Sequence, residues 1–125
     1  MEVLKAIFRY LVNDVESSVS FYTQFLGFKL EQQFGPAMAI VSRDGFTLWL
    51  AGPKSSAAQP MPDGKIPQSG GWNRFVLQVE DLNGLVTKLK SQDVPFRNDI
   101  VGGPGGHQVL CEDPSGNVIE LFQPA

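Results

Sequence analysis

The alternation of hydrophobic and polar residues predicts the secondary structure of the first half of the chain. Residues 6–12 are rich in strand formers, and core-facing residues then recur at helical spacing from about Val15 to Phe25. Asn13 or Asp14 is the candidate N-cap for this helix, and Gly27 is expected to end it. Three short apolar runs with strand composition follow: 28–34, 37–42 and 46–51. The first half therefore has the predicted order βαβββ.

The second half repeats this order. A strand is predicted over 75–79 and a helix from about Leu82 to Gln92, with Glu80-Asp81 as its cap. Three more strands are expected: 96–101, 107–112 and 117–123. The last two flank Asp113-Pro114-Ser115-Gly116, which has the composition of a tight turn. The end of the chain is therefore predicted to be a β-hairpin.

The two halves also match in sequence. Val12-Asn13-Asp14-Val15 corresponds to Val79-Glu80-Asp81-Leu82, an offset of 67 positions (12 to 79). The run 45–53 corresponds to 116–124, an offset of 71 positions (45 to 116). We therefore predict one domain over 1–125 with module one at about 3–53 and module two at about 72–124.

A connecting segment at 54–71 separates the predicted modules. It lies in a proline-rich stretch without hydrophobic periodicity, so it is predicted to be a loop. A loop of this length in a small domain usually has a function or is disordered. Two interpretations remain open: a linker between the modules, or a lid over a site.

The final hairpin places Glu120 on the strand face opposite to Ile119 and Leu121. The run 113–122, Asp-Pro-Ser-Gly-Asn-Val-Ile-Glu-Leu-Phe, resembles the closing hairpin of the vicinal oxygen chelate (VOC) superfamily, which comprises glyoxalases, bleomycin resistance proteins and extradiol dioxygenases. The resemblance implies an α+β fold in which two tandem βαβββ modules form a curved eight-stranded cup with the helices outside.

The resemblance also implies positions for metal ligands. Carried onto this repeat, the four ligand positions of the metal-binding members fall on Ile7, Trp49, Arg74 and Glu120. Only Glu120 carries a suitable donor, because Ile7 and Trp49 offer none and Arg74 is a cation. We therefore expect no cofactor, with a divalent metal held by a different ligand set as the alternative.

Strand alternation places several side chains on the inward face of the implied cup. The candidate ligand-binding residues are Arg9, Trp49, Arg74, Gln78, Glu120 and Phe122, with His107 near the mouth of the pocket. His107 is suited to acid–base work near neutral pH, although a single histidine at a strand start is also typical of a surface residue. In the simpler interpretation the arginines pair with carboxylates and Trp49 fills the core.

Composition narrows the class of protein. The net charge of −3 argues against a nucleic-acid partner, and no apolar run is long enough to span a membrane. The single cysteine, Cys111, excludes an internal disulfide and indicates a small core residue rather than a nucleophile. The N-terminal residues lack the pattern of a signal peptide, so a cytoplasmic location is expected.

Three functions remain as hypotheses. The first is a metal-independent VOC protein that binds a small organic molecule, anionic or aromatic, in the cup. The second is a metal-dependent lyase or dioxygenase in which His107 and Glu120 bind one metal ion. The third is an interaction module without a ligand. A homodimer is expected from the resemblance, and whether any reaction is catalysed is left open by the sequence.

Overall fold

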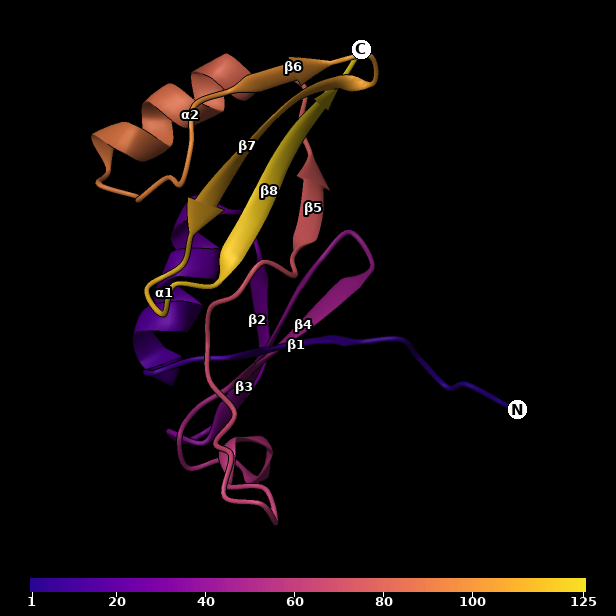
Figure 1. Ribbon diagram of the computed structural model, residues 1–125, viewed down its shortest axis with the longest axis vertical. Helices are drawn as coiled ribbons and strands as arrows, with labels where there is room; N and C mark the ends of the chain where they lie inside the picture. The colour runs from indigo at the N-terminus through magenta and orange to yellow at the C-terminus, as the bar shows by residue number, and fades with distance from the viewer. The chain divides into compact units, whose positions relative to one another are not determined.

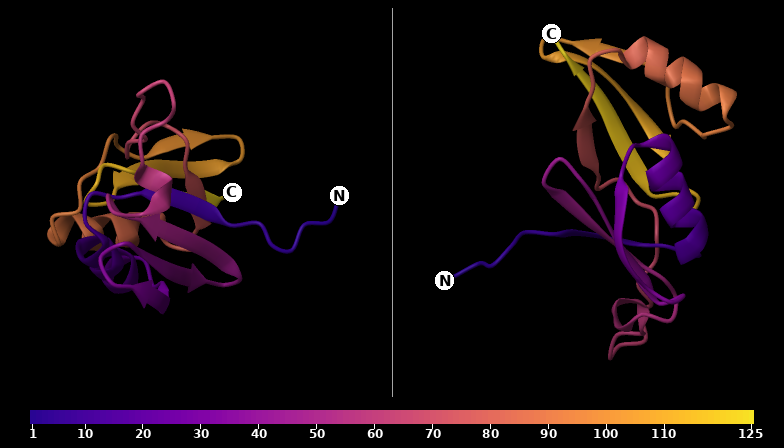
Figure 2. Two further views of the ribbon diagram at one scale, coloured as in Figure 1. Left: turned by 90° about the horizontal axis from the view of Figure 1, so that it is seen from below. Right: turned by 180° about the vertical axis from the view of Figure 1, so that it is seen from behind.

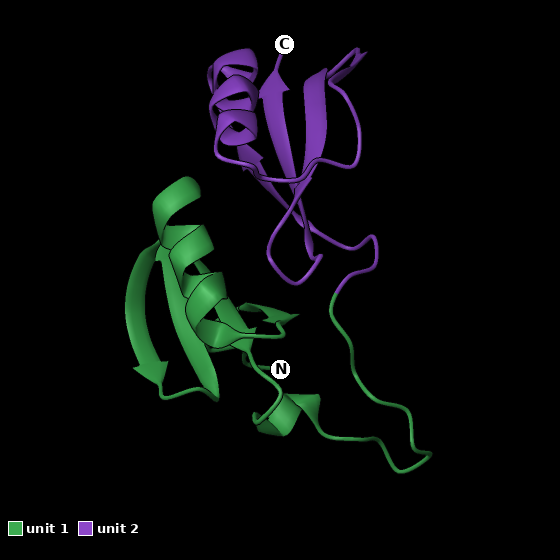
Figure 3. Cartoon of the chain, turned by 90° about the vertical axis from the view of Figure 1, so that its left-hand side faces the viewer, with its two compact units in different colours: residues 1–69 green, residues 70–125 purple.

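The computed structural model describes all 125 residues and contains two compact units, 1–69 and 70–125 (Figure 3). Each unit has one four-stranded sheet and one α-helix. Figure 1 labels these elements, and Figure 2 gives two further views of them. The boundary falls after Ser69, inside the predicted connection 54–71. The predicted α+β class with two tandem βαβββ modules is therefore confirmed. No helix of the chain is long and apolar enough to cross a membrane.

Unit one follows the predicted element order. Its elements are β1 (Phe8–Leu11), α1 (Val15–Phe25), β2 (Lys29–Phe34), β3 (Met38–Arg43) and β4 (Phe46–Ala51). The strand order in the sheet is β1-β4-β3-β2, with β1 parallel to β4 and the other pairs antiparallel. Every strand predicted in this half is present, with ends that differ by no more than two residues.

Both ends of α1 are fixed by the residues that the sequence indicated. The Asp14 carboxylate accepts a hydrogen bond from the Ser17 amide at 2.9 Å, which caps the N-terminus and lowers the pKa of Asp14. Gly27 follows the helix with a φ of 71°, a conformation that side chains disfavour. The Arg43 guanidinium donates to the carbonyl of Leu26, so a strand side chain satisfies the end of the helix.

The helix covers one face of the sheet of unit one (Figure 3). Tyr22 is fully buried there, together with Val41 and Leu48 from the strands beneath. Val19, which the helical spacing places toward the core, is only half-buried. Ser18 is buried instead, and its hydroxyl is satisfied because it donates to the carbonyl of Asp14 at 2.7 Å.

Unit two repeats this arrangement. Its elements are β5 (Phe75–Gln78), α2 (Leu82–Ser91), β6 (Val101–Gly103), β7 (Gly106–Glu112) and β8 (Val118–Pro124). The strand order is β5-β8-β7-β6, with β5 parallel to β8, which is the order of unit one. Arg9 pairs with Trp49 in unit one and Val76 with Glu120 in unit two. These are the pairs that the two sequence offsets predict, so the internal repeat is structural.

The strand predicted over 96–101 is wrong for most of its length. Phe96 makes a single bridge to Cys111, and the regular strand begins only at Val101. Between them the Asn98 side chain accepts a hydrogen bond from the Leu110 amide at 2.9 Å. Because a side chain takes the place of a backbone carbonyl, the ladder is interrupted there. The glycine-rich stretch 102–106 forms the end of β6, the turn and the start of β7.

The turn between β7 and β8 is built around Asp113, as its sequence indicated. The buried Asp113 carboxylate accepts hydrogen bonds from the amides of Ser115 and Asn117 at 2.8 and 2.9 Å. Its second oxygen accepts from the side-chain amide of Asn117 at 3.0 Å. Gly116 has a φ of 81°, which the reversal requires. This network fixes the start of β8 and therefore the direction of the Glu120 side chain.

Candidate functional site

The candidate site residues other than His107 lie on the face of each sheet turned away from the helix of its own module, which we call the helix-distal face. In module one this face carries Arg9 and Trp49, which are directly paired across β1 and β4. The Arg9 guanidinium lies 5.0 Å from the centre of the Trp49 ring, within the range of a cation–π interaction. Arg9 takes part in none of the ion pairs of the structure, so its positive charge is not neutralised by a carboxylate.

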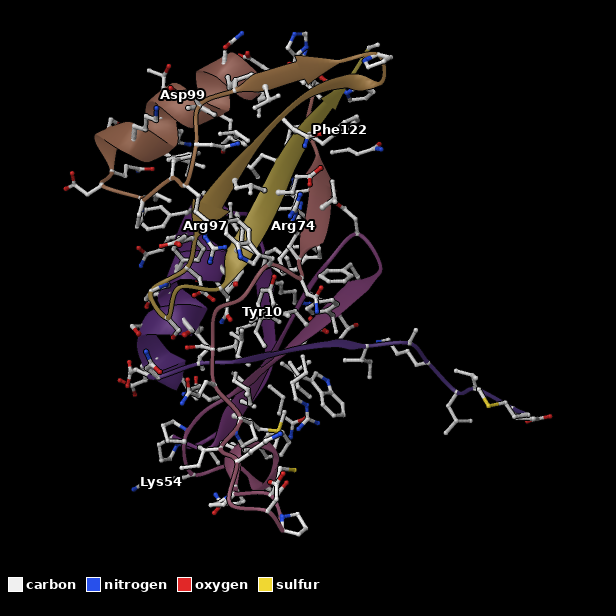
Figure 4. The ribbon with its side chains drawn as sticks, viewed as in Figure 1. Tyr10, Lys54, Arg74, Arg97, Asp99 and Phe122 are labelled. Carbon is white, nitrogen blue, oxygen red and sulfur yellow. The ribbon has the colours of Figure 1, made fainter.

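The helix-distal face of module two is centred on Glu120, which is flanked by Val76 and Leu110 in the neighbouring strands. Arg74, which is labelled in Figure 4, donates from Nε and Nη2 to Oε1 of Glu120, at 3.0 and 2.8 Å. A third nitrogen, Nη1, donates to the carbonyl of Trp72 at 3.3 Å. The arginine that the sequence placed beside Glu120 is therefore its ion-pair partner, in agreement with the simpler interpretation of this residue.

One oxygen of the Glu120 carboxylate stays open. Oε2 accepts no hydrogen bond from the protein. No buried polar side-chain atom of the chain lacks a partner, so Oε2 must reach solvent although Glu120 is only 8% exposed. An accessible carboxylate oxygen between Val76 and Leu110 is suited to accept a hydrogen bond from a ligand.

Gln78 and Phe122 form the next cross-strand row of the same face. They pair with each other across β5 and β8, and Gln108 pairs with Phe122 from the other side. Phe122 is half-buried and is labelled on β8 in Figure 4. An aromatic ring between two carboxamides combines an apolar surface with hydrogen-bonding groups, as small-molecule sites do. Gln108 and Leu110 were not among the candidate site residues predicted from the sequence. Strand alternation, counted back from the turn at 113–116, would have placed both on this face.

His107 does not lie with the other candidates. It pairs with Gln123, so it lies on the face of the sheet that carries α2 and not on the helix-distal face. There His107 and Gln123 line a hollow of about 350 Å³ beside the start of α2. The hypothesis of a metal bound by His107 and Glu120 requires both side chains on one face, and the cross-strand pairing places them on opposite faces.

The donor set of the chain does not fit the metal centre that the family resemblance implies. Ile7 and Trp49 have no donor for a metal, and Arg74 is paired with Glu120. No group of three or more His, Cys, Asp or Glu side chains lies close enough together to hold a metal ion. Structural and catalytic metal sites need at least three such protein ligands in most cases.

A second arginine cluster, centred on Arg97, was not predicted from the sequence. Arg97 donates to the Glu112 carboxylate at 2.6 Å and to the carbonyls of Gly71 and Gly116 at 2.7 and 2.9 Å. Its guanidinium lies 4.6 Å from the centre of the Trp72 ring. Arg97 therefore fastens the segment before β5 to the final turn, and this segment carries Arg74. No signal in the sequence indicated this role, because Arg97 is a single charged residue in the segment 96–101, which was wrongly predicted to be a strand.

Cys111 is a core residue, as the sequence indicated. Its side chain is fully buried in β7, and burial raises the pKa of the thiol to about 12. A thiol with such a pKa holds its proton at neutral pH and is a poor nucleophile.

Comparison with known proteins agrees with this architecture. The family model described as Glyoxalase/Bleomycin resistance protein/Dioxygenase superfamily matches residues 6–121. A lactoylglutathione lyase from Pseudomonas putida is 25% identical over 140 residues, which cover 90% of this chain and 80% of the lyase. The crystal structure of TnmS3, an antibiotic binding protein from Streptomyces sp. CB03234, is similar with a TM-score of 0.69 and 25% identity over the whole of both chains. A hypothetical protein from S. aureus, SA1046, has a TM-score of 0.77 at 20% identity, over 98% of this chain and 95% of its own.

Proposed function

This chain belongs to the Glyoxalase/Bleomycin resistance protein/Dioxygenase superfamily, and we propose that it binds a small organic molecule without the usual metal centre of that superfamily. The expected ligand is anionic or aromatic and contacts a helix-distal face. The observation that carries this proposal is the ion pair between Arg74 and Glu120. This ion pair involves Glu120, the only one of the four implied ligand positions that holds a residue able to bind a metal.

The ion pair supports metal independence on electrostatic grounds. A divalent cation at Glu120 would have to displace or tolerate the Arg74 guanidinium, whose nearest nitrogen lies 2.8 Å from Oε1. Like charges at such a distance in a partly buried site repel strongly. The Arg74 side chain is 28% exposed and the Glu120 side chain 11%, so solvent screens this repulsion only in part.

Arg9 and Trp49 support the choice of ligand. Arg9 carries a positive charge without a carboxylate partner, and Trp49 offers an aromatic surface beside it. An aromatic carboxylate matches both groups, because its anion pairs with the guanidinium while its ring contacts the indole. The similarity to TnmS3, an antibiotic binding protein, favours binding of an organic compound over a structural role.

A metal-dependent lyase is the second candidate function. The similarity to a lactoylglutathione lyase favours it, whereas the donor set on the helix-distal faces does not. Elemental analysis of protein expressed in metal-replete medium separates the two candidates. We expect no stoichiometric zinc, nickel, manganese or iron, and no change of Tm on addition of each ion. Near-stoichiometric metal with a Tm increase of several degrees would replace our proposal with the lyase.

Ligand binding is tested with benzoate as the first probe. We expect benzoate to quench or shift Trp49 fluorescence in a Trp72→Phe background, because Trp49 is then the only tryptophan. Arg9→Gln should weaken this binding by about tenfold, the effect of losing about 1.4 kcal/mol of charge attraction. Lys5→Gln is the matched control, since it removes an equal charge from the exposed N-terminal segment. Equal weakening by both variants would show a general charge effect instead of a site.

A homodimer and a cytoplasmic location form part of the same proposal. The N-terminal segment exposes Val3 and Leu4, and the edge strand β2 exposes Leu30 and Phe34. Exposed apolar side chains on a terminal segment and a sheet edge favour association with a second copy. Sedimentation equilibrium of the purified chain tests this directly, and a single species of 13.7 kDa at all concentrations would contradict it.

A further inference from the structure

The segment after β4 lines a half-open cavity within unit one that the proposed function does not use. The cavity has a volume of about 600 Å³, and its walls come from residues 11–13, Ala51 and the segment 53–69. We propose that it is a second binding site, selective for uncharged molecules that carry an amide or lactam group. The volume lies within the range of about 300–1,000 Å³ that is usual for small-molecule sites.

The cavity lies at the carboxyl ends of two adjacent parallel strands. Leu11 ends β1 and Ala51 ends β4, and the Val12 amide donates to the Ala51 carbonyl at 2.9 Å. The chain then passes Gly52, where a Cβ atom would lie 2.8 Å from Cγ2 of Val15 and 2.9 Å from the Pro36 carbonyl. Only glycine allows this close approach, so the position of the segment relative to β4 is set by the sequence.

Local hydrogen bonds hold the first part of the segment in shape. The buried Ser55 hydroxyl donates to the Gly52 carbonyl at 2.7 Å, just before a short 3-10 helix, η1 (Ser56–Ala58). Gln59 then donates from Nε2 to the Ser55 carbonyl at 3.0 Å. The wall of the cavity is therefore an ordered turn and not an unstructured linker. This favours a covering role over the linker interpretation for this part of the connection.

The absence of charged side chains from the lining favours an uncharged ligand. None of the residues that line the cavity is Asp, Glu, Lys, Arg or His. Lys54 is adjacent in sequence to the lining residue Pro53, but it is exposed and does not line the cavity; Figure 4 labels its position. A charged ligand would lose part of its hydration in this half-open cavity without gaining an ionic partner, which costs free energy. The site therefore prefers uncharged molecules.

Two of the polar side chains in the lining, Gln59 and Gln68, are suited to bind an amide. The Nε2 group of Gln59 is used within the loop, so its Oε1 is available as an acceptor. The carboxamide of Gln68 makes no hydrogen bond in the structure and offers both donors and an acceptor. A molecule with an N–H and a C=O group side by side satisfies both side chains. Three proline rings, Pro53, Pro60 and Pro67, provide apolar walls for the rest of the ligand.

The test compares benzamide with benzoate, two probes of nearly equal shape that differ in charge. Methyl NMR spectra of the full chain report on Leu11, Ala51 and Ala58, which all line the cavity. We expect benzamide to shift these methyl signals in a saturable way, with binding at least about tenfold tighter than that of benzoate. Binding of benzoate at these methyl groups as tight as that of benzamide would overturn the proposal, as would the absence of any shift.

Two variants locate the binding. Ala58→Phe fills the cavity, whereas Ala57→Phe places the same ring on the neighbouring residue, which does not line it. We expect the first variant to weaken benzamide binding at least about tenfold and the second to leave it unchanged. Gln68→Leu changes an exposed side chain without disturbing the fold and should weaken binding by about threefold to tenfold. If neither Ala58→Phe nor Gln68→Leu weakens binding, the cavity is not the site. The Trp49 signal tests the helix-distal face separately, so failure here leaves the proposed function intact.

Discussion

Arg74 directs two of its nitrogens at a single oxygen of Glu120, at 3.0 and 2.8 Å, and leaves the second oxygen open. The pair therefore neutralises a partly buried carboxylate without exhausting its capacity to accept hydrogen bonds. This arrangement is useful in a binding face, because the carboxylate is held in place while one oxygen remains available to a ligand. It also makes the two residues energetically dependent on each other.

Removal of one partner should therefore cost more than removal of both. We expect Arg74→Met to lower the free energy of unfolding by about 1–3 kcal/mol, since it leaves a carboxylate without its cation. The double variant Arg74→Met with Glu120→Gln should recover at least half of this loss. Urea denaturation of the four proteins in a double-mutant cycle measures the coupling. If the losses of the two single variants add up to the loss of the double variant, Arg74 and Glu120 are not energetically coupled, and this prediction is wrong.

Arg97 should stabilise module two and hold Trp72 in a fixed environment. Its three hydrogen-bonded partners and its stacking on Trp72 cannot all be reproduced by an ammonium group. We expect Arg97→Lys to lower the free energy of unfolding by about 1–3 kcal/mol. In a Trp49→Phe background, the fluorescence intensity of the remaining tryptophan, Trp72, should change, because the guanidinium no longer lies over its ring. Lys88→Arg, on the exposed side of α2, is the control, and identical behaviour of the two variants would refute this role.

Gly52 should be intolerant of a side chain. Its added Cβ would meet the Val15 side chain and the backbone of Pro36, so Gly52→Ala should destabilise the chain by about 1–3 kcal/mol through overpacking. Gly103 is the matched control, because an added Cβ there meets nothing within 4 Å. Gly103→Ala should change stability by less than about 0.5 kcal/mol. Thermal and urea denaturation of both variants give the comparison, and equal effects would contradict the steric explanation.

The Cys111 thiol should resist labelling in the native chain and react after unfolding. Burial raises its pKa from 9.0 to about 12, so the native state retains a proton that the unfolded state has lost between these pH values. The contribution to stability is therefore complete below pH 9 and is lost as the pH rises toward 12.

Two measurements check the behaviour of this thiol. A disulfide-exchange reagent at pH 8 should give no reaction with the native chain and one thiol per chain in denaturant. Between pH 9 and about 12, the wild type should lose more stability than Cys111→Ala. Rapid labelling of the native thiol at pH 8 would show that Cys111 is accessible.

The elements of this fold were predictable because their signals are local. Asp14 and Gly27 mark the ends of α1 through their own backbone preferences, and the Asp113 turn specifies the last hairpin in the same way. The break at Asn98 was not predictable, because its side chain replaces a ladder hydrogen bond only after β7 has come alongside. Propensity describes residues 96–101 as a strand, and the tertiary contact overrides it.

Strand alternation predicted which face of the sheet each candidate site residue lies on, but it did not predict the contacts made by the loops. Alternation placed Arg9 with Trp49 and set Glu120 apart from its buried neighbours, and the structure agrees. The Arg97 cluster could not be predicted, since its partners come from two regions distant in sequence, the segment before β5 and the final hairpin. The cavity beside the 53–69 segment likewise depends on how a loop folds back, which hydrophobic periodicity does not describe.

Trp49 and Glu120 occupy equivalent positions of the two halves, each beside a parallel first strand. In an assembly of identical single halves, symmetry would require the same residue at both positions. Because one polypeptide carries both halves, this requirement does not apply, and the two positions hold different residues. In module one this position holds Trp49, whose ring lies beside Arg9, an arginine without a carboxylate partner. In module two it holds Glu120, which forms an ion pair with Arg74. The two helix-distal faces therefore offer different chemistries on the same strand arrangement.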